Sequence, residues 1–392
     1  MMIKIGYNKS DRHYGFSTHY ECPDRINVCV RNLKKFYSNE YFITNLDSSL
    51  KGTESESDTE LVQYESILEL IKLVHNDEYI KHIQNPTISH VVCRNCKKRI
   101  PSEYNSFENF IINTPNCEHC NEIIKKSNII SYLSVDTYVT PYTFSVILDA
   151  VNVLSKLVEE LAQNKILYGF ALIRPPGHHC NNDANGFCHV NNAMIASKYA
   201  QIIGYSKVLI LDIDFHHGDG TEKLIKSSTN FNSIYMVSIH GYGELVYPGT
   251  GNASDSNSNI LNIPIDITIH PESRHYVTDE FYQNLFDTKA LPWIQLINPD
   301  FIIISNGYDS HREDELEGFN ITDKTYLHIT NKLKLLHKPL LFITEGGYSI
   351  QTISRVTYNM IELLNQPVLD DTSVSVFSDI IDNSKDVVKG DK

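Results

Sequence analysis

The fold is decided by the segment VLILDIDFHHGDGT at residues 208–221. It begins with an apolar run, Val208–Ile213, that passes directly into residues able to bind a metal or move a proton. Short runs rich in Ile, Val and Leu are typical of buried strands. Because parallel α/β sheets form their sites at the carboxyl ends of strands, the polar residues after Ile213 are expected at such a site.

Three further apolar runs end in the same way. They are Ile166–Ile173 before RPPGHH (174–179), Phe301–Ile304 before NGYD (306–309) and Leu340–Thr344 before EGGY (345–348). Helical patterns precede two of the four runs, at Phe144–Ala162 and at Asn192–Ile203, where Gly204 fits the helix end. Strands that alternate with helices predict a parallel sheet, so the four polar ends could converge on one site.

The first candidate site is a metal centre. Asp212, Asp214 and His216 share one face of an extended chain because they are spaced two residues apart. Asp214 and His216 can bind one metal, with Asp309 as a third ligand from another strand end. Three ligands with one open position are typical of catalytic zinc. A single Asp or His at a strand end would more often be a hydrogen-bonded loop residue.

A second group of residues could move protons. The segment Pro-Pro-Gly holds His178 and His179 rigidly, as metal ligands or as an acid–base pair. Once Asp214 and Asp309 are assigned as metal ligands, the carboxylates of Asp212 and Asp219 are left, and each could orient one imidazole. Tyr348 follows two glycines that could bring its hydroxyl to the metal, although a half-buried tyrosine with a solvated hydroxyl is the ordinary alternative.

Together these stretches resemble the zinc-dependent histone deacetylase family, and its class II members in particular. The matching motifs, in family order, are PDRI (23–26), DTYVTP (136–141), RPPGHH (174–179), GFCHVNN (186–192), DIDFHHGDGT (212–221), VSIH (237–240), YPGTG (247–251), NGYDSH (306–311) and EGGY (345–348). The resemblance implies a three-layer arginase/deacetylase fold, with a mostly parallel central sheet between helices. The catalytic domain is expected over residues 1–365, and residues 366–392 as a mobile tail.

The resemblance also implies roles for individual residues. The catalytic zinc ligands would be Asp214, His216 and Asp309; the other catalytic residues would be His178, His179, Asp212, Asp219 and Tyr348. The acyl-lysine tunnel would involve Gly186, Phe187, Tyr247 and Leu316, while Arg25 matches an arginine of the N-terminal loop. Asp212 and Ser238 match a potassium site of relatives. The implied cofactors are zinc and K+.

The expected reaction is hydrolysis of acetyl or other acyl groups from lysine side chains of proteins such as histones, with sensitivity to hydroxamates and a role in chromatin regulation. The alternative is an acetylpolyamine or another small amide. Polyamine deacetylases of the family carry a glutamate gatekeeper; the alignment places Leu316 there, with Glu317 one residue away. Arginase-like dimetal chemistry and a non-catalytic scaffold are further alternatives.

The chain departs from the family by an insertion at residues 88–126. Its pairs Cys93-Arg-Asn-Cys96 and Cys117-Glu-His-Cys120 have the spacing of a four-cysteine structural zinc, in a small zinc knuckle or ribbon. Because the intervening segment has few apolar residues, a metal would supply the missing stability. A flexible loop with coincidental thiols is the alternative.

The composition of the chain narrows the classes of protein to which it could belong. The chain has 392 residues, of which 41% are hydrophobic, and a net charge of -14. No basic cluster indicates direct nucleic-acid binding, and no apolar run is long enough for a membrane span. Eight cysteines without a secretory context favour a reducing compartment, hence the nucleus or cytoplasm. Residues 47–60 are expected to form a solvated loop, and oligomerisation is left open.

Overall fold

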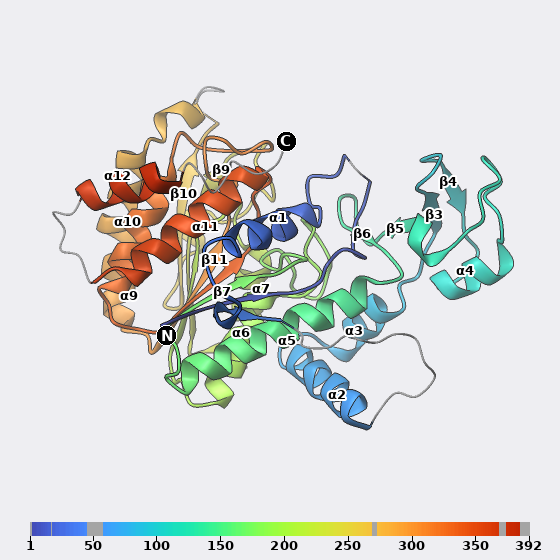
Figure 1. Ribbon diagram of the computed structural model, residues 1–392, viewed down its shortest axis with the longest axis horizontal. Coiled ribbons are helices and arrows are strands. Elements are labelled where there is room, and N and C mark those ends of the chain that lie inside the picture. Colours follow the sequence, from blue (N-terminus) through green and yellow to red (C-terminus); the bar gives the residue numbers. More distant parts are fainter. Residues whose placement is uncertain (1, 17, 45–57, 269–272, 368–373, 385–392) are drawn as a thin grey trace.

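The computed structural model describes residues 2–16, 18–44, 58–268, 273–367 and 374–384. Its centre is an eight-stranded sheet in the order β10-β9-β8-β11-β12-β7-β1-β2. Every neighbouring pair in this sheet is parallel. Figure 1 shows helices on both sides of the sheet and a smaller unit of strands and one helix projecting at the right. The predicted parallel sheet between helical layers is confirmed.

The strands of the large sheet are β1 (Ile3–Tyr7), β2 (Phe42–Ile43), β7 (Tyr168–Leu172), β8 (Val208–Asp212), β9 (Ile234–Tyr242), β10 (Ile260–Asp266), β11 (Phe301–Asn306) and β12 (Leu340–Thr344). The helices around it are α1 (Asp24–Leu33), α2 (Asp58–Lys72), α3 (Asp77–Gln84), α5 (Thr143–Ala162), α6 (Asn192–Ile202), α7 (Asp219–Ser227), α8 (Asp279–Leu285), α9 (Leu291–Ile297), α10 (Asp323–Lys334), α11 (Ile350–Asn365) and α12 (Val374–Asn383).

The alternation of side chains along each strand divides the interior into two cores. In β8, Leu209 and Leu211 pack into the core that also contains residues of α1, α10 and α11. Val208 and Ile210 face the opposite core, which contains residues of α5 and α6. Because both faces are covered, the strand is apolar throughout, as expected for a parallel sheet.

The four predicted polar strand ends belong to adjacent strands. The central part of the sheet has the order β8-β11-β12-β7, and these strands carry the segments that follow residues 212, 306, 344 and 172. Parallel strands end at the same edge, so chain segments as far apart as residues 174 and 348 meet there. The helix before β8 ends as predicted: Gly204 adopts a φ of 121° directly after the helix.

Three expectations about local structure need adjustment. The sequence pattern at Ser66–His82 predicts one helix, but the structure has two, α2 and α3. Asn76 begins the second one by accepting a hydrogen bond from Tyr79 N as its N-cap. Within the expected tail, α12 is a packed helix whose Ile380 is buried in the core beside α11. Of the loop expected at residues 47–60, residues 47–57 lie outside the described residues. Its last three residues, from Asp58, belong to α2.

The insertion contributes two strands to a second, smaller sheet, and the segment after it contributes the other two. The strands β3 (His90–Cys93), β4 (Arg99–Pro101), β5 (Ile129–Tyr132) and β6 (Tyr138–Val139) pair antiparallel in the order β4-β3-β5-β6. Helix α4 (Phe107–Asn113) packs against it through Phe107 and Phe110. We call the unit from β3 to β6 the cysteine module. Its small core shows that the segment is a folded unit, and the limits 88–126 stay a prediction.

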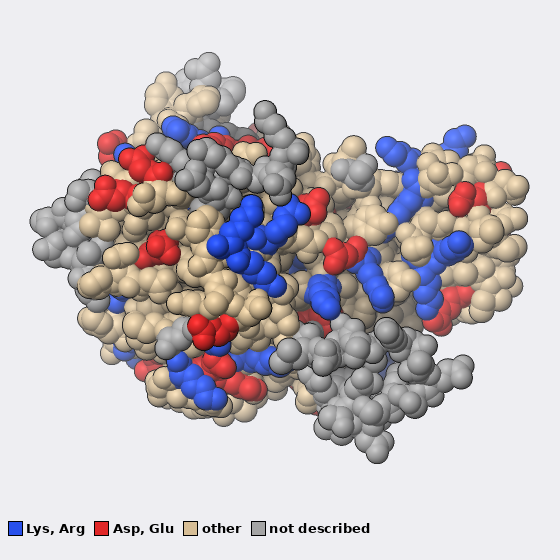
Figure 2. All heavy atoms as spheres, viewed as in Figure 1, with Lys and Arg blue, Asp and Glu red and all other residues tan. Residues whose placement is uncertain are grey.

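The described surface carries charged side chains of both signs. Figure 2 shows basic and acidic side chains interspersed on one face, over both the main body and the cysteine module. Lys97 and Lys98, in the turn between β3 and β4, and Arg99, the first residue of β4, are exposed. Among the described residues, no helix is long and apolar enough to cross a membrane.

Candidate active site

The three predicted metal ligands meet at the carboxyl edge of the sheet. Nδ1 of His216 lies 3.1 Å from Oδ1 of Asp214 and 3.1 Å from Oδ2 of Asp309. One ligand atom from each residue lies within 4.8 Å of the others, and all three side chains are buried. Ligand bonds of about 2.0 Å to a tetrahedral metal would separate ligand atoms by about 3.3 Å, so the donor set fits one ion of zinc's size.

The main chain orients the two carboxylates toward His216. Asp214 Oδ2 accepts a hydrogen bond from Gly346 N at 2.8 Å, and Asp309 Oδ1 accepts one from Phe215 N at 2.9 Å. The remaining oxygen of each carboxylate faces the imidazole. Burial, together with the nearby charge of Asp214, raises the pKa of Asp309 to about 7. Two carboxylates buried this closely are costly without a cation, which is further support for a metal centre.

The tandem histidines lie beside this cluster with separate carboxylate partners. Nδ1 of His178 is 3.1 Å from Oδ2 of Asp212, and Nδ1 of His179 is 2.8 Å from Oδ1 of Asp219. The two imidazole rings are 3.9 Å apart between centroids. The expected pairing of each histidine with its own aspartate is therefore present in the structure. Because each aspartate binds Nδ1, the Nε2 atom of each ring is left to interact with a molecule in the pocket that both histidines line.

Tyr348 lies at the same pocket and is buried, with 7% of its surface exposed. Its ring packs edge-on to Phe187 at 6.0 Å, and the guanidinium of Arg25 lies 5.0 Å from its centroid. Arg25 also donates to the carbonyl oxygens of Gly347 and Glu345. These contacts fix the turn that carries Tyr348. Burial raises the pKa of Tyr348 well above its ordinary value, so its hydroxyl stays protonated.

Aromatic side chains form the walls of the pocket. It is lined by Asp136, Pro176, His178, His179, Gly186, Phe187, Asp214, His216, Tyr247, Leu316, Glu317, Gly346 and Tyr348. Gly186 permits the close approach of this wall, since a Cβ there would lie 2.4 Å from Cδ2 of His179. Phe187 has a φ of 67°, which is a strained conformation for a residue with a side chain. The predicted tunnel residues thus line one pocket.

Two pocket residues were not assigned from the sequence. Glu317 lines the pocket beside Leu316, so the predicted gatekeeper position is joined by an acidic neighbour. Asp136 also lines the pocket, and its Oδ1 accepts a hydrogen bond from Gly186 N at 3.2 Å. The sequence did show that Asp136 belongs to the DTYVTP motif. Its contact with Gly186 could not be seen there, because fifty residues of chain separate the two.

The predicted potassium residues are neighbours in the sheet. Asp212 of β8 is the register partner of Ser238 of β9. The hydroxyl of Ser238 lies 2.8 Å from Nδ1 of His240, and Oδ1 of Asp212 accepts from Asp214 N at 3.1 Å. The two residues are therefore adjacent, and their role in binding potassium stays a prediction.

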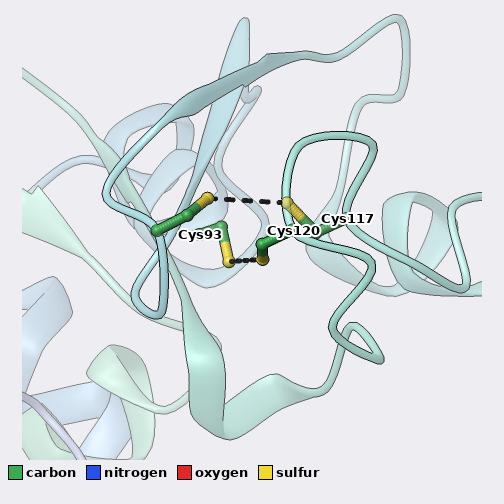
Figure 3. A group of neighbouring side chains, drawn as sticks. Cys93, Cys117 and Cys120 are labelled. Carbon is green, nitrogen blue, oxygen red and sulfur yellow. Dashed lines mark hydrogen bonds between the residues drawn. The ribbon is translucent and has the colours of Figure 1, made fainter.

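The four cysteines of the module also come together. Cys93 Sγ lies 3.8 Å from Cys120 Sγ, and Cys96 Sγ lies 3.7 Å from Cys117 Sγ. All four sulfur atoms lie within 4.8 Å of one another. Figure 3 shows Cys117 and Cys120 on one loop, facing Cys93 across a narrow gap.

Comparison with known proteins agrees with this geometry. Residues 19–364 match the family model of the histone deacetylase domain. The chain is 35% identical to Histone deacetylase 15 of Arabidopsis thaliana over 256 residues, which are 63% of this chain and 45% of that protein. It is 31% identical to Acetylpolyamine amidohydrolase 1 of Pseudomonas aeruginosa over 245 residues, which are 59% of this chain and 66% of that protein.

The chain is also 27% identical to Type-2 histone deacetylase 2 of Dictyostelium discoideum over 367 residues, which are 85% of this chain and 19% of that protein. The chain thus spans less than half the length of the Arabidopsis and Dictyostelium relatives.

Solved structures extend the similarity to the whole fold. The crystal structure of the HDA15 HD domain superposes with a TM-score of 0.69 at 26% identity, covering 98% of this chain and 97% of that one. An acetylpolyamine aminohydrolase from Burkholderia pseudomallei superposes with a TM-score of 0.66 at 19% identity, covering 92% and 98%, which supports the fold alone. The predicted arginase/deacetylase fold is confirmed. The chain belongs to the histone deacetylase domain family, a family of hydrolases.

Proposed function

We propose that the protein is a zinc-dependent deacylase that hydrolyses acetyl or related acyl groups from lysine side chains. One observation carries the proposal: Asp214 and His216, two of three buried side chains that could hold one metal ion, line a pocket together with His178, His179 and the buried Tyr348. A zinc ion held by Asp214, His216 and Asp309 would polarise the acyl carbonyl and lower the pKa of water toward about 7.

The protein's own residues then move the protons. His179 accepts a proton from the attacking water and later donates one to the leaving lysine amine. Asp219 holds Nδ1 of His179 at 2.8 Å, which leaves Nε2 for this transfer. His178, held by Asp212, supplies electrostatic support beside it. Tyr348 donates a hydrogen bond to the carbonyl oxygen as negative charge develops there.

The pocket walls favour an extended acyl-lysine side chain. Phe187 and Tyr247 are apolar surfaces that can enclose a methylene chain, and Leu316 adds to them. Val135 and Leu245, close in sequence to Asp136 and Tyr247, are fully exposed and could contact residues that flank the lysine. An acylated protein segment, with histones as one candidate, therefore fits better than a small free amide.

A second candidate substrate is an acetylpolyamine, and Glu317 is the observation that favours it. This carboxylate lines the pocket together with Asp136, so a substrate with a further ammonium group would gain an attractive contact. The relative from Pseudomonas aeruginosa is named as an acetylpolyamine amidohydrolase.

Turnover of a panel separates these candidates. The panel contains acetyl-, butyryl- and myristoyl-lysine peptides and two acetylpolyamines, each assayed with and without a hydroxamate inhibitor. We expect hydroxamate-sensitive turnover of acyl-lysine peptides, with kcat/KM higher than for either polyamine. Asp214→Ala is the control for contaminating activity. If the purified protein with bound zinc deacylates no member of the panel, the proposed function is wrong.

A further inference from the structure

The cysteine module has the geometry of a tetrahedral thiolate site. Zinc–sulfur bonds of about 2.3 Å place the sulfurs of a tetrahedron about 3.8 Å apart. The two paired separations in this protein are 3.8 and 3.7 Å, between Cys93 and Cys120 and between Cys96 and Cys117. A disulfide would need about 2.05 Å instead. The spacing therefore suits four thiolates around one ion.

The two cysteine pairs are held by equivalent turns. Lys97 N donates to Cys93 O at 2.8 Å, and Asn121 N donates to Cys117 O at the same distance. Lys97 and Asn121, each directly after the second cysteine of its pair, have φ values of 59° and 57°. This repeated left-handed turn presents both sulfurs of a pair to one point. Two such turns facing each other form a ligand cage.

We propose that the cysteine module binds one structural zinc ion, and that this ion fixes the wall of the acyl-lysine pocket through strands β3, β5 and β6. The metal site stands on the cysteine geometry alone. The coupling to the pocket rests on the function proposed above. Zinc is preferred because four cysteine ligands leave no open position, as in structural zinc sites.

The first half of the connection is a ladder of backbone hydrogen bonds. Cys93 is the last residue of β3 and is in register with Ile129 of β5. In turn, Tyr132 of β5 is in register with Tyr138 of β6. The loop between these two strands contains Asp136 and Thr137. A metal that holds the end of β3 therefore also limits the movement of this loop.

The second half of the connection is a pair of hydrogen bonds to the pocket wall. Thr137 Oγ1 accepts from Phe187 N at 3.0 Å, and Asp136 Oδ1 accepts from Gly186 N at 3.2 Å. These are the two wall residues with positive φ, and Phe187 needs outside support to keep that conformation. Thr137 is thus a positioning residue for Phe187.

A parallel contact runs from Arg94, which lies between the first two cysteines. Its guanidinium lies 3.5 Å from the centroid of Tyr14, and it donates to Tyr14 O and to Ser127 O. Tyr14 belongs to the N-terminal loop, whose His19 packs edge-on to Phe187 at 5.0 Å. The module therefore contacts the N-terminal loop as well as carrying the β5–β6 loop, and both of these loops contact Phe187.

Metal content tests the site without using activity. We expect two zinc ions per chain by elemental analysis in the wild type, one in Cys96→Ser/Cys120→Ser, and two in the matched control Cys22→Ser. After substitution with cobalt, the wild type should show the near-ultraviolet absorption of a cobalt–thiolate bond, and the double cysteine variant should lack it. One zinc in the wild type that Asp214→Ala removes, with no thiolate band, would overturn the metal site.

Kinetics test the coupling. We expect kcat/KM for an acyl-lysine peptide to fall about tenfold to 100-fold in the double cysteine variant, while its catalytic zinc and folded circular dichroism spectrum remain. Thr137→Val removes the acceptor for Phe187 N and should cause a similar loss. If both act by one route, combining them should add little. Unchanged kinetics in the variant that has lost its second zinc, or fully additive losses, would refute the coupling.

Discussion

Nδ1 of His179 lies 2.8 Å from Oδ1 of Asp219, while the other oxygen of the same carboxylate accepts a hydrogen bond from Lys223 Nζ at 2.7 Å. Asp219 begins helix α7, whereas His179 follows strand β7. Two segments separated by forty residues thus fix one imidazole. This arrangement sets both the orientation and the tautomer of His179, because a carboxylate can only accept from Nδ1–H.

Replacing Asp219 by Asn should therefore lower kcat/KM for an acyl-lysine peptide by about 10-fold to 100-fold, since the amide can also stabilise the wrong tautomer. The zinc content should remain at the wild-type level, as Asp219 is no metal ligand in this arrangement. Steady-state kinetics and elemental analysis check both points. Lys223→Gln is the matched control, because it removes an exposed partner of the same carboxylate, and its loss should be clearly smaller.

Tyr348→Phe removes one hydroxyl and leaves the ring packing against Phe187 and Arg25 in place. If the hydroxyl stabilises the developing oxyanion, kcat should fall by about 100-fold to 1,000-fold with little change in KM. Thermal melting and zinc content should match the wild type. Turnover close to the wild-type rate in the folded variant would contradict the role assigned to Tyr348.

Glu317→Gln tests the choice of substrate class. If Glu317 attracts the second ammonium group of a polyamine, its neutralisation should lower kcat/KM for acetylpolyamines and leave uncharged acetyl-lysine peptides unaffected. A loss of about 1 kcal/mol, or roughly fivefold, is expected for a partly exposed pair. The ratio of the two kcat/KM values is the measurement. Equal effects on both substrates would show that Glu317 acts on the shape of the pocket instead. Leu316→Ala, the adjacent pocket residue, is the control.

Glu21→Gln should destabilise the fold near the active site. Both oxygens of Glu21 accept from Arg174, Oε1 from Nε at 2.5 Å and Oε2 from Nη2 at 2.6 Å, and neither side chain is exposed. Removing the negative charge leaves the guanidinium buried without compensation, which costs about 3–5 kcal/mol. Denaturant unfolding measures this loss. Glu40→Gln, at an exposed glutamate, should change the unfolding free energy by less than about 0.5 kcal/mol.

The sequence predicted the positions of the polar strand ends well, because the signal for each of them is local. Each of the four polar segments directly follows an apolar strand, so the strand ends at residues 212 and 344 could be predicted to within about a residue. Convergence of these ends then followed from the parallel sheet. The role of Asp136 could not be predicted in this way, because it depends on a hydrogen bond to Gly186, which lies far along the chain.

Two other features were missed although the sequence contained a signal. In α12, Val376, Phe377, Ile380 and Ile381 pack against the core and have helical spacing, but the charged residues after them suggested a tail. In the cysteine module, Phe107 and Phe110 are spaced by three residues and face one small core. Both signals are short, and only tertiary packing distinguishes such a pattern from chance.

His75 makes the stability of the protein depend on pH. Its Nδ1 donates to Asn181 O at 2.8 Å, while its Nε2 accepts from Asn191 N at 2.9 Å, so the bonded form is the neutral imidazole. Burial lowers the pKa of His75 from 6.5 to about 4, against a smaller opposite effect of Asn181. Between these values the unfolded chain binds more protons than the folded one, so this contribution to stability is complete above pH 6.5 and falls as the pH decreases toward 4.

The wild type should therefore lose more unfolding free energy between pH 7 and pH 5 than His75→Gln, by about 2 kcal/mol, because glutamine does not titrate. Urea unfolding of both proteins at the two pH values measures the difference, and carboxylates cancel in the comparison because both proteins share them. Asn191 N stays within reach of the glutamine oxygen, so the variant should still fold at pH 7. Parallel pH profiles for the two proteins would mean that His75 is charged, or solvated, in the folded state. The junction of α2 and α3 would then be more open to water than its packing against the Asn181–Asn191 loop implies.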